Sequence, residues 1–138
     1  MIKKIAHVAI ATRSIAVMSE FYKTLGLEID AIETVRDQKV KVAMMRVGDS
    51  MLELVEALEE DSAISKFIDK RGEGLHHISL EVDDIRGHLE TLKSKNIRLI
   101  DEEPREGADD CWIAFIHPDS TGGVLIELNQ KKQGGGAE

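Results

Sequence analysis

The chain contains two stretches that align with each other, and this internal repeat constrains its fold more than any other feature. One stretch begins KKIAHVAIATRSIAVMSEFYKTLGLEID, and the other begins EGLHHISLEVDDIRGHLETLKSKNIRLI. The alignment places His7 opposite His77, and it places Glu53 of MLELVE opposite Glu127 of GVLIELN. Each copy is about 60–65 residues long, and a unit of that size has little core of its own, so the two copies are expected to pair.

Both copies predict the same order of elements: a strand, a helix and three more strands. Apolar, β-branched residues fill 4–11, and apolar residues then recur at helical spacing until Gly26. The predicted strands are 4–11, 27–35, 40–47 and 50–56 in the first copy and 75–82, 97–102, 111–117 and 124–129 in the second. The predicted helix caps are Thr12 or Ser14, Asp61 or Ser62 in a short linking helix, and Asp83 or Asp84.

These elements predict an α+β protein with two tandem βαβββ modules whose strands form a curled mixed β-sheet around a cleft. We expect a single domain over residues 1–130. Module one would cover about 1–60, the linker helix about 61–72 and module two about 73–130. Residues 131–138, KKQGGGAE, are polar and rich in glycine, so we expect them to form a disordered tail.

Charge and cysteine content narrow the function classes. The net charge of −8 argues against nucleic acid or an anionic membrane as a partner, because both require basic patches. No apolar run approaches the roughly 20 residues of a membrane span. The single cysteine, Cys111, excludes an internal disulfide and suits a reducing compartment, so we expect a cytoplasmic protein.

Each histidine and glutamate of the repeat also has a simpler interpretation. A lone histidine on an apolar strand, such as His7, is usually a core residue, and a lone glutamate usually faces solvent on the outer side of a sheet. Glu53 and Glu127, however, both interrupt apolar strands, where a carboxylate is costly unless it is paired, solvated or bound to a metal. Because all four residues occupy matching positions in the two copies, the sequence favours one metal site built from His7, Glu53, His77 and Glu127.

Two imidazoles and two carboxylates form a mixed nitrogen and oxygen ligand set. Such a set suits Co²⁺, Mn²⁺, Zn²⁺, Ni²⁺ or Fe²⁺ better than Ca²⁺. Four protein ligands on an octahedral ion leave two positions open. These positions could bind two adjacent oxygens of a substrate, with the ion acting as a Lewis acid.

The paired modules with their His…Glu…His…Glu set resemble the vicinal oxygen chelate superfamily, whose fold is also called the glyoxalase/bleomycin resistance fold. A closer resemblance, to the methylmalonyl-CoA epimerase family, covers about residues 3–130 and is carried by several segments. They are HVAIA at 7–11, FYKTLGLE at 21–28, LELVEAL at 52–58, DSAISKFIDKRGEGLHHISLEVDDI at 61–85, IRLIDEEPREGA at 97–108 and FIHPDSTGGVLIEL at 115–128.

This resemblance implies an isomerase that interconverts (2R)- and (2S)-methylmalonyl-CoA by removing and returning the C2 proton through a metal-stabilised enolate. It implies a divalent metal cofactor, Co²⁺ first and Mn²⁺, Zn²⁺ or Ni²⁺ otherwise. It also implies a CoA thioester as the small-molecule partner, a homodimer and a place in propionate metabolism. The resemblance does not identify the cationic side chains that contact CoA, and the candidates are Lys41, Arg46 and Arg98.

The family's metal ligands fall on His7, His77 and Glu127, with Glu53 as the fourth. Some members carry a catalytic glutamate where this chain has Val42, and a glutamine where it has Glu53. This departure suggests that the second carboxylate has moved, so we expect Glu127 and Glu53 to be the two proton carriers. The alternatives are a glyoxalase I-type lactoylglutathione lyase and a non-catalytic small-molecule-binding module of the same fold.

Overall fold

The computed structural model describes residues 1–132, and its contacts divide the chain into two compact units. The N-terminal unit is residues 7–76, and the C-terminal unit combines residues 1–6 with the chain from residue 77 onward. The strand order is β2-β3-β4-β1 in the N-terminal unit and β5-β8-β7-β6 in the C-terminal unit. Strands β1 (Ile2–Ala11) and β5 (Gly74–Val82) each contribute residues to both units.

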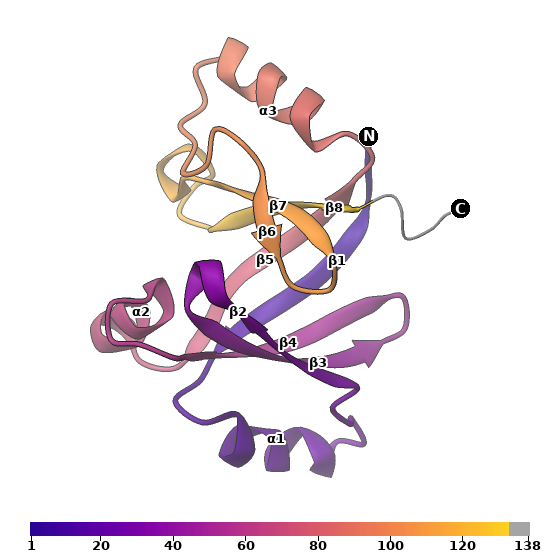
Figure 1. The fold of residues 1–138 in the computed structure, drawn as a ribbon, viewed down its shortest axis with the longest axis vertical. Helices are drawn as coiled ribbons and strands as arrows, with labels where there is room; N and C mark the ends of the chain where they lie inside the picture. The colour runs from indigo at the N-terminus through magenta and orange to yellow at the C-terminus, as the bar shows by residue number, and fades with distance from the viewer. Residues whose placement is uncertain (133–138) are drawn as a thin grey trace. The chain divides into compact units, whose positions relative to one another are not determined.

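The N-terminal unit follows the predicted strand–helix–strand pattern. Its further elements are α1 (Ile15–Thr24), β2 (Ala31–Val35), the 3₁₀ turn η1 (Arg36–Gln38), β3 (Val40–Val47), β4 (Ser50–Ala57) and α2 (Ala63–Arg71). Strand β1 pairs in parallel with β4, whereas β3 is antiparallel to both β2 and β4. Helix α1 lies on one face of these strands (Figure 1), where Ile15 packs with Ala43, Met45 and Leu54.

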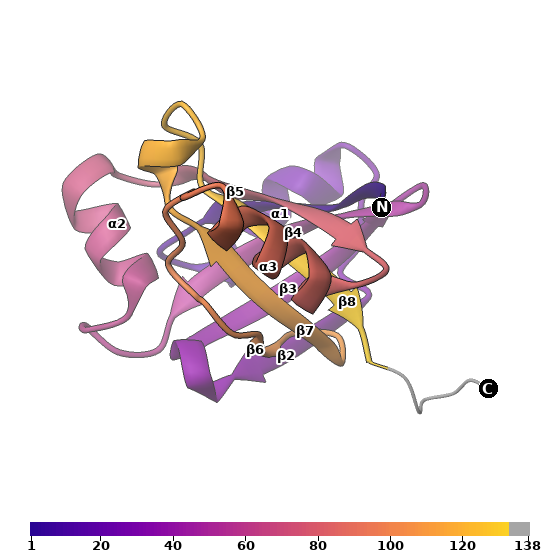
Figure 2. The same cartoon turned by 90° about the horizontal axis from the view of Figure 1, so that it is seen from above.

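The C-terminal unit repeats the arrangement. Its further elements are α3 (Ile85–Ser94), β6 (Arg105–Gly107), β7 (Cys111–Ile116), the 3₁₀ turn η2 (Pro118–Ser120) and β8 (Ile126–Lys131). Strand β5 is parallel to β8, and β7 is antiparallel to β6 and β8. Helix α3 crosses this sheet (Figure 2), and Ile85 and Leu89 pack against Ala114, Ile116 and Leu128.

The helices begin at the polar residues that the sequence predicts, with the alternatives now resolved. The caps are Ser14, Ser62 and Asp84, and each side chain accepts a hydrogen bond from an amide in the first helical turn. A second acceptor reaches α1 and α3 from the sheet. Glu56 of β4 accepts from the first amide of α1, and Gln130 of β8 accepts from the first amide of α3, both at 2.8 Å.

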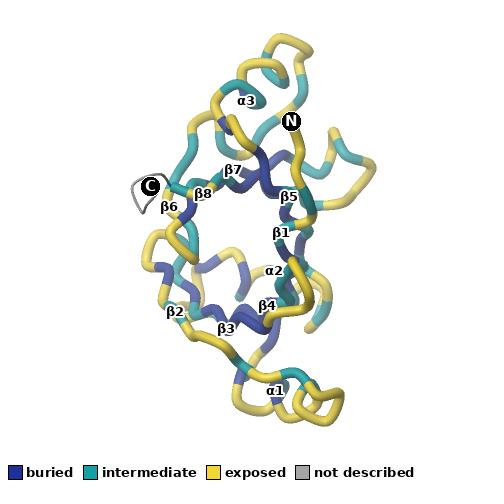
Figure 3. The backbone as a smooth tube through the Cα atoms, turned by 90° about the vertical axis from the view of Figure 1, so that its right-hand side faces the viewer, coloured by how far each residue is buried: buried dark blue, intermediate teal, exposed yellow. Residues whose placement is uncertain are grey.

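Strand alternation separates the two faces of each sheet. In β1 the buried positions are His7, Ala9 and Ala11, and the residues between them are less buried. In β5 the buried positions are His77, Ser79, Glu81 and Val82. Figure 3 shows the buried positions following the strands, while α1 and α3 keep long exposed stretches. One face of each sheet therefore packs against its helix, and the other face carries the histidines.

Two strand predictions are wrong in their position. The segment 97–102 contains only an isolated bridge at Leu99, because Ile100 and Asp101 both donate backbone hydrogen bonds to the Phe115 carbonyl and the Asp101 carboxylate accepts from the Phe115 amide. The second strand of the second module is instead Arg105–Gly107. The strand predicted at 27–35 begins only at Ala31.

Other predictions about the fold can be compared with the described residues one by one. The α+β class and the βαβββ order of both modules are confirmed. Strand β8 extends through Lys131, and Lys132 contacts the Trp112 ring, so the start of the predicted tail is part of the fold. Residues 133–138 of that tail lie outside the described part of the chain. Across residues 1–132, the structure has no helix of sufficient length and apolarity to cross a membrane.

Leu89→Ala should lower the free energy of unfolding by about 2–5 kcal/mol, because it leaves a cavity between α3 and the sheet at a side chain that is only 1% exposed. Leu58→Ala is the matched control, since Leu58 is 48% exposed, and should cost less than about 0.5 kcal/mol. Urea unfolding followed by circular dichroism measures both. Equal losses in the two variants would contradict the assigned packing of α3.

Candidate active site

In the N-terminal unit, the predicted histidine and glutamate meet on adjacent parallel strands. His7 lies on β1 and Glu53 on β4, with the register placing Ala9 directly opposite Glu53. The His7 Nδ1 lies 3.3 Å from Glu53 Oε2, and both side chains are at most 10% exposed. Because directly opposite residues of neighbouring strands face the same side of a sheet, His7, Ala9 and Glu53 share one face.

The C-terminal unit contains the equivalent pair. His77 lies on β5 and Glu127 on β8, and the register places Ser79 opposite Glu127. The His77 Nε2 lies 3.9 Å from Glu127 Oε1, with both side chains at most 8% exposed. The His77 ring packs edge-to-face with the Phe115 ring, with ring centroids 5.1 Å apart. This contact fixes the orientation of the imidazole.

His76 does not belong to this face. Its ring packs edge-to-face against Phe67 of α2, with ring centroids 4.9 Å apart. The neighbouring histidines of the HHI segment therefore have different roles. His77 is the one paired with a carboxylate, as the alignment of the two copies predicts.

The donor chemistry of these residues fits a divalent metal ion. His7, His77 and Glu127 are all buried, and each offers a nitrogen or oxygen atom that such an ion could bind. Glu53 is also buried, with 6% exposure. Carboxylates that lose their hydration on burial need compensating positive charge, and borderline divalent ions accept both imidazole and carboxylate ligands.

The faces that carry the two pairs differ in polarity. Beside His7 and Glu53 the face is apolar, with Met44 opposite Glu53 and Val42 opposite Val55, all of them buried. Beside His77 and Glu127 the face is mixed, because the apolar Phe115 and Ile113 of β7 lie opposite Glu127 and Asn129, while polar residues line β5 and β8. Its further polar residues are Ser79, Glu81 and Asn129, all at most 7% exposed. Strand alternation in HISLEV places Ser79 and Glu81 on the His77 face, although the match between the two copies does not mark them.

Val42 has a carboxylate neighbour that sequence reasoning missed. Glu33 of β2 is directly opposite Val42, so it shares the face that carries Glu53. Glu33 and Glu53 lie two strand spacings apart across the sheet and are offset by two residues along the strand direction. With neighbouring strands about 4.8 Å apart, their Cα atoms are about 12 Å from each other. The signal was weak, because Glu33 interrupts the short strand Ala31–Val35 and no histidine accompanies it.

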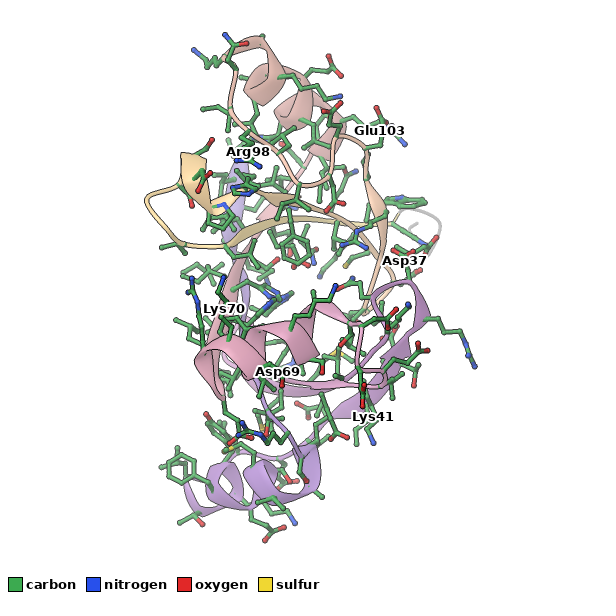
Figure 4. All side chains as sticks on the ribbon, turned by 90° about the vertical axis from the view of Figure 1, so that its left-hand side faces the viewer. Asp37, Lys41, Asp69, Lys70, Arg98 and Glu103 are labelled. Carbon is green, nitrogen blue, oxygen red and sulfur yellow. The ribbon has the colours of Figure 1, made fainter. Side chains whose placement is uncertain are left out.

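The three cations considered for CoA binding are placed differently. Arg46 lies opposite Met51, which is itself opposite His7, so Arg46 shares the histidine face and is exposed. Lys41 projects from the opposite face of β3. The guanidinium of Arg98 is 2.8 Å from the Asp119 carboxylate; Figure 4 labels both Lys41 and Arg98.

Arg105 is a further cation, which the sequence analysis did not single out. It lies opposite Ile113 on the face that carries Glu127, with its guanidinium 6.0 Å from the Phe115 ring centroid and Nε 3.2 Å from Asp101. Cys111, by contrast, is chemically quiet. Burial first, and then the Asp109 charge, raise the pKa of its thiol to about 12, so Cys111 carries no thiolate near neutral pH.

The class of protein follows from the tandem modules and their matched pairs. Residues 6–115 match the family model of the Glyoxalase/Bleomycin resistance protein/Dioxygenase superfamily, to which the chain therefore belongs. The predicted glyoxalase-type fold is thereby confirmed. Among individual relatives, the uncharacterized protein YqjC of Bacillus subtilis is 42% identical over 130 residues, which are 94% of this chain and 93% of that protein.

Two further relatives have an assigned activity. The mitochondrial methylmalonyl-CoA epimerase of Homo sapiens is 37% identical over 92% of this chain and 73% of that protein. A structure of Streptomyces coelicolor methylmalonyl-CoA epimerase in complex with 2-nitronate-propionyl-CoA superposes with a TM-score of 0.92 at 35% identity, covering 95% of this chain and 96% of that chain. Within the superfamily, the chain belongs to the methylmalonyl-CoA epimerase family.

Proposed function

We propose that this protein interconverts (2R)- and (2S)-methylmalonyl-CoA by moving the proton on C2. The observation that carries the proposal is the pair of buried histidine–glutamate contacts, at 3.3 Å and 3.9 Å, in equivalent positions of the two units. Family membership supplies the substrate class, because the human relative bears this activity by name. A CoA thioester with an acidic hydrogen at C2 suits acid–base chemistry by carboxylates.

The proposed metal ligands are His7, Glu53, His77 and Glu127. Co²⁺ is the first candidate, and Mn²⁺, Zn²⁺ and Ni²⁺ are the others, since all four accept mixed nitrogen and oxygen donors. When bound, such an ion supplies Lewis-acid stabilisation of the negative charge that develops beside C2. The two histidines act as neutral ligands, and each is held by the strand pairing that also positions its glutamate.

The two glutamates are the proposed proton carriers. Glu127 removes the C2 proton from one face of the substrate, and the electron pair of the broken C–H bond delocalises into the thioester carbonyl. Glu53 delivers a proton to the opposite face, so the configuration at C2 inverts. In the reverse direction the two carboxylates exchange roles. The apolar face around Val42, Met44 and Val55 limits the access of water to Glu53.

The biological setting stays a set of predictions. We propose a cytoplasmic homodimer that acts in propionate metabolism, with the CoA moiety contacting cations on the histidine face. Arg46 is the best placed of the three initial candidates, because Lys41 faces the other side and Arg98 is paired with Asp119.

Incubating metal-loaded protein with (2R)-methylmalonyl-CoA in D₂O tests the function directly. The expected result is deuterium at C2 together with formation of the (2S) epimer, because protonation from the opposite face uses solvent-derived deuterons. Mass spectrometry measures deuterium at C2, and a stereospecific enzymatic assay of the (2R) epimer that remains measures its conversion to the (2S) epimer. Conversion of only the methylglyoxal–glutathione hemithioacetal would instead establish a lactoylglutathione lyase, and binding without turnover of either compound would establish a binding module.

His77→Ala should abolish stoichiometric metal binding, because it removes a buried imidazole that is paired with Glu127. His76→Ala is the matched control at the adjacent position and should bind one equivalent of metal, because His76 packs against Phe67. Plasma mass spectrometry after dialysis against Co²⁺ gives the metal content. One full equivalent in His77→Ala would refute the proposed ligand set.

Glu53→Gln should keep the metal, because an amide oxygen can still coordinate, while epimerisation falls by about 10²–10⁴-fold, the usual contribution of an acid–base group. Deuterium exchange from one epimer should survive, because Glu127 still serves its own face. Glu33→Gln is the control carboxylate on the same sheet face. Should Glu53→Gln turn over normally and Glu33→Gln not, the second proton carrier is Glu33 rather than Glu53.

A further inference from the structure

Ser79 is unusual among the buried hydroxyl groups of this protein. Its side chain is fully buried, with 0% exposure, and its Oγ has no hydrogen-bond partner among residues 1–132. The other buried hydroxyls are satisfied: Thr12 donates to Glu73, Ser19 donates to the Ala16 carbonyl, and the Ser62 oxygen accepts from an amide. An unsatisfied buried hydroxyl costs free energy of folding, so its presence calls for a role outside the static fold.

The position of Ser79 indicates that role. Ser79 is two residues beyond His77 on β5 and directly opposite Glu127 on β8, so all three side chains face the same side of the sheet. In the structure, the Glu127 carboxylate lies toward His77, with 3.9 Å between Oε1 and Nε2. A hydroxyl group can donate one hydrogen bond. The acceptor that the strand register places beside it is the Glu127 carboxylate.

The other unit provides an internal comparison. There the residue opposite Glu53 is Ala9, which has no donor. The two glutamates therefore occupy equivalent positions with equivalent histidines, and they differ in whether a hydroxyl faces them across the strand pair. A difference of this kind can give the two carboxylates unequal parts in one reaction.

We infer that Ser79 is a positioning residue, whose hydroxyl donates a hydrogen bond to the Glu127 carboxylate when Glu127 turns from His77 toward the substrate. The inference rests on the proposed function. In the step it supports, Glu127 accepts the C2 proton and the C–H electron pair stays on the substrate. Ser79 transfers no proton and touches no substrate atom, so its contribution is the orientation of the carboxylate.

Ser79→Ala tests the inference in two independent ways. In metal-free protein the variant should raise the melting temperature by a few degrees, because it removes an unsatisfied polar group from the interior. In metal-loaded protein it should lower kcat for C2 deuterium exchange by about tenfold to a hundredfold for one epimer, with a smaller effect for the other. KM and the Kd for Co²⁺ should stay within about threefold, because Ser79 is neither a substrate contact nor a ligand.

Thr12→Val is the matched control, because it removes a buried hydroxyl that is hydrogen-bonded to Glu73 outside the site. It should lower the melting temperature and leave exchange unchanged. A lower melting temperature for Ser79→Ala would overturn the inference, since the hydroxyl would then be a structural donor. Unchanged exchange in Ser79→Ala with an active wild-type protein would overturn the role of Ser79 alone, whereas no exchange by the wild-type protein would overturn the proposed function and this role together.

Discussion

Parallel strand pairing is the constraint on which the rest of this structure depends. β1 pairs with β4, and β5 pairs with β8, so that in each unit a histidine on one strand approaches a glutamate on the other. A one-residue shift in either register would turn the glutamate to the opposite face, because side chains alternate along a strand. In each unit the helix packs against the strands that hold this register.

The sequence predicted the parts of this arrangement that depend on periodicity. Alternation predicts the strands Val40–Val47 and Ser50–Ala57, and capping residues predict where the helices begin, because both are local properties. It failed at residues 97–107, where the chain runs beside β7 through irregular bonds to Phe115 and then pairs as Arg-Glu-Gly. A strand of three residues with two charges has no hydrophobic pattern, so only its long-range partners define it.

The candidate site shows the same division. The four proposed ligands come from the repeat, because each has a counterpart at the matching position of the other copy. Ser79 and Glu33 were not among them, because the repeat does not mark them. Their cross-strand partners, Glu127 and Val42, are set by the register of the sheet. Cross-strand partners depend on how the strands pair, which the local sequence does not reveal. The repeat marks the residues that the two copies share, whereas the asymmetry of the site comes from residues that differ between them, such as Ser79 and Ala9.

The strand side chains that cap α1 and α3 have a consequence for folding accuracy. Glu56 follows Glu53 by three residues on β4, and Gln130 follows Glu127 by three residues on β8. A two-residue slip of either strand would keep every side chain on its correct face, so burial alone would hardly reject it. It would nevertheless carry the capping oxygen about 7 Å from the helix end. The two capping hydrogen bonds therefore disfavour a register error that hydrophobic patterning tolerates. They do so on the same strands that carry Glu53 and Glu127.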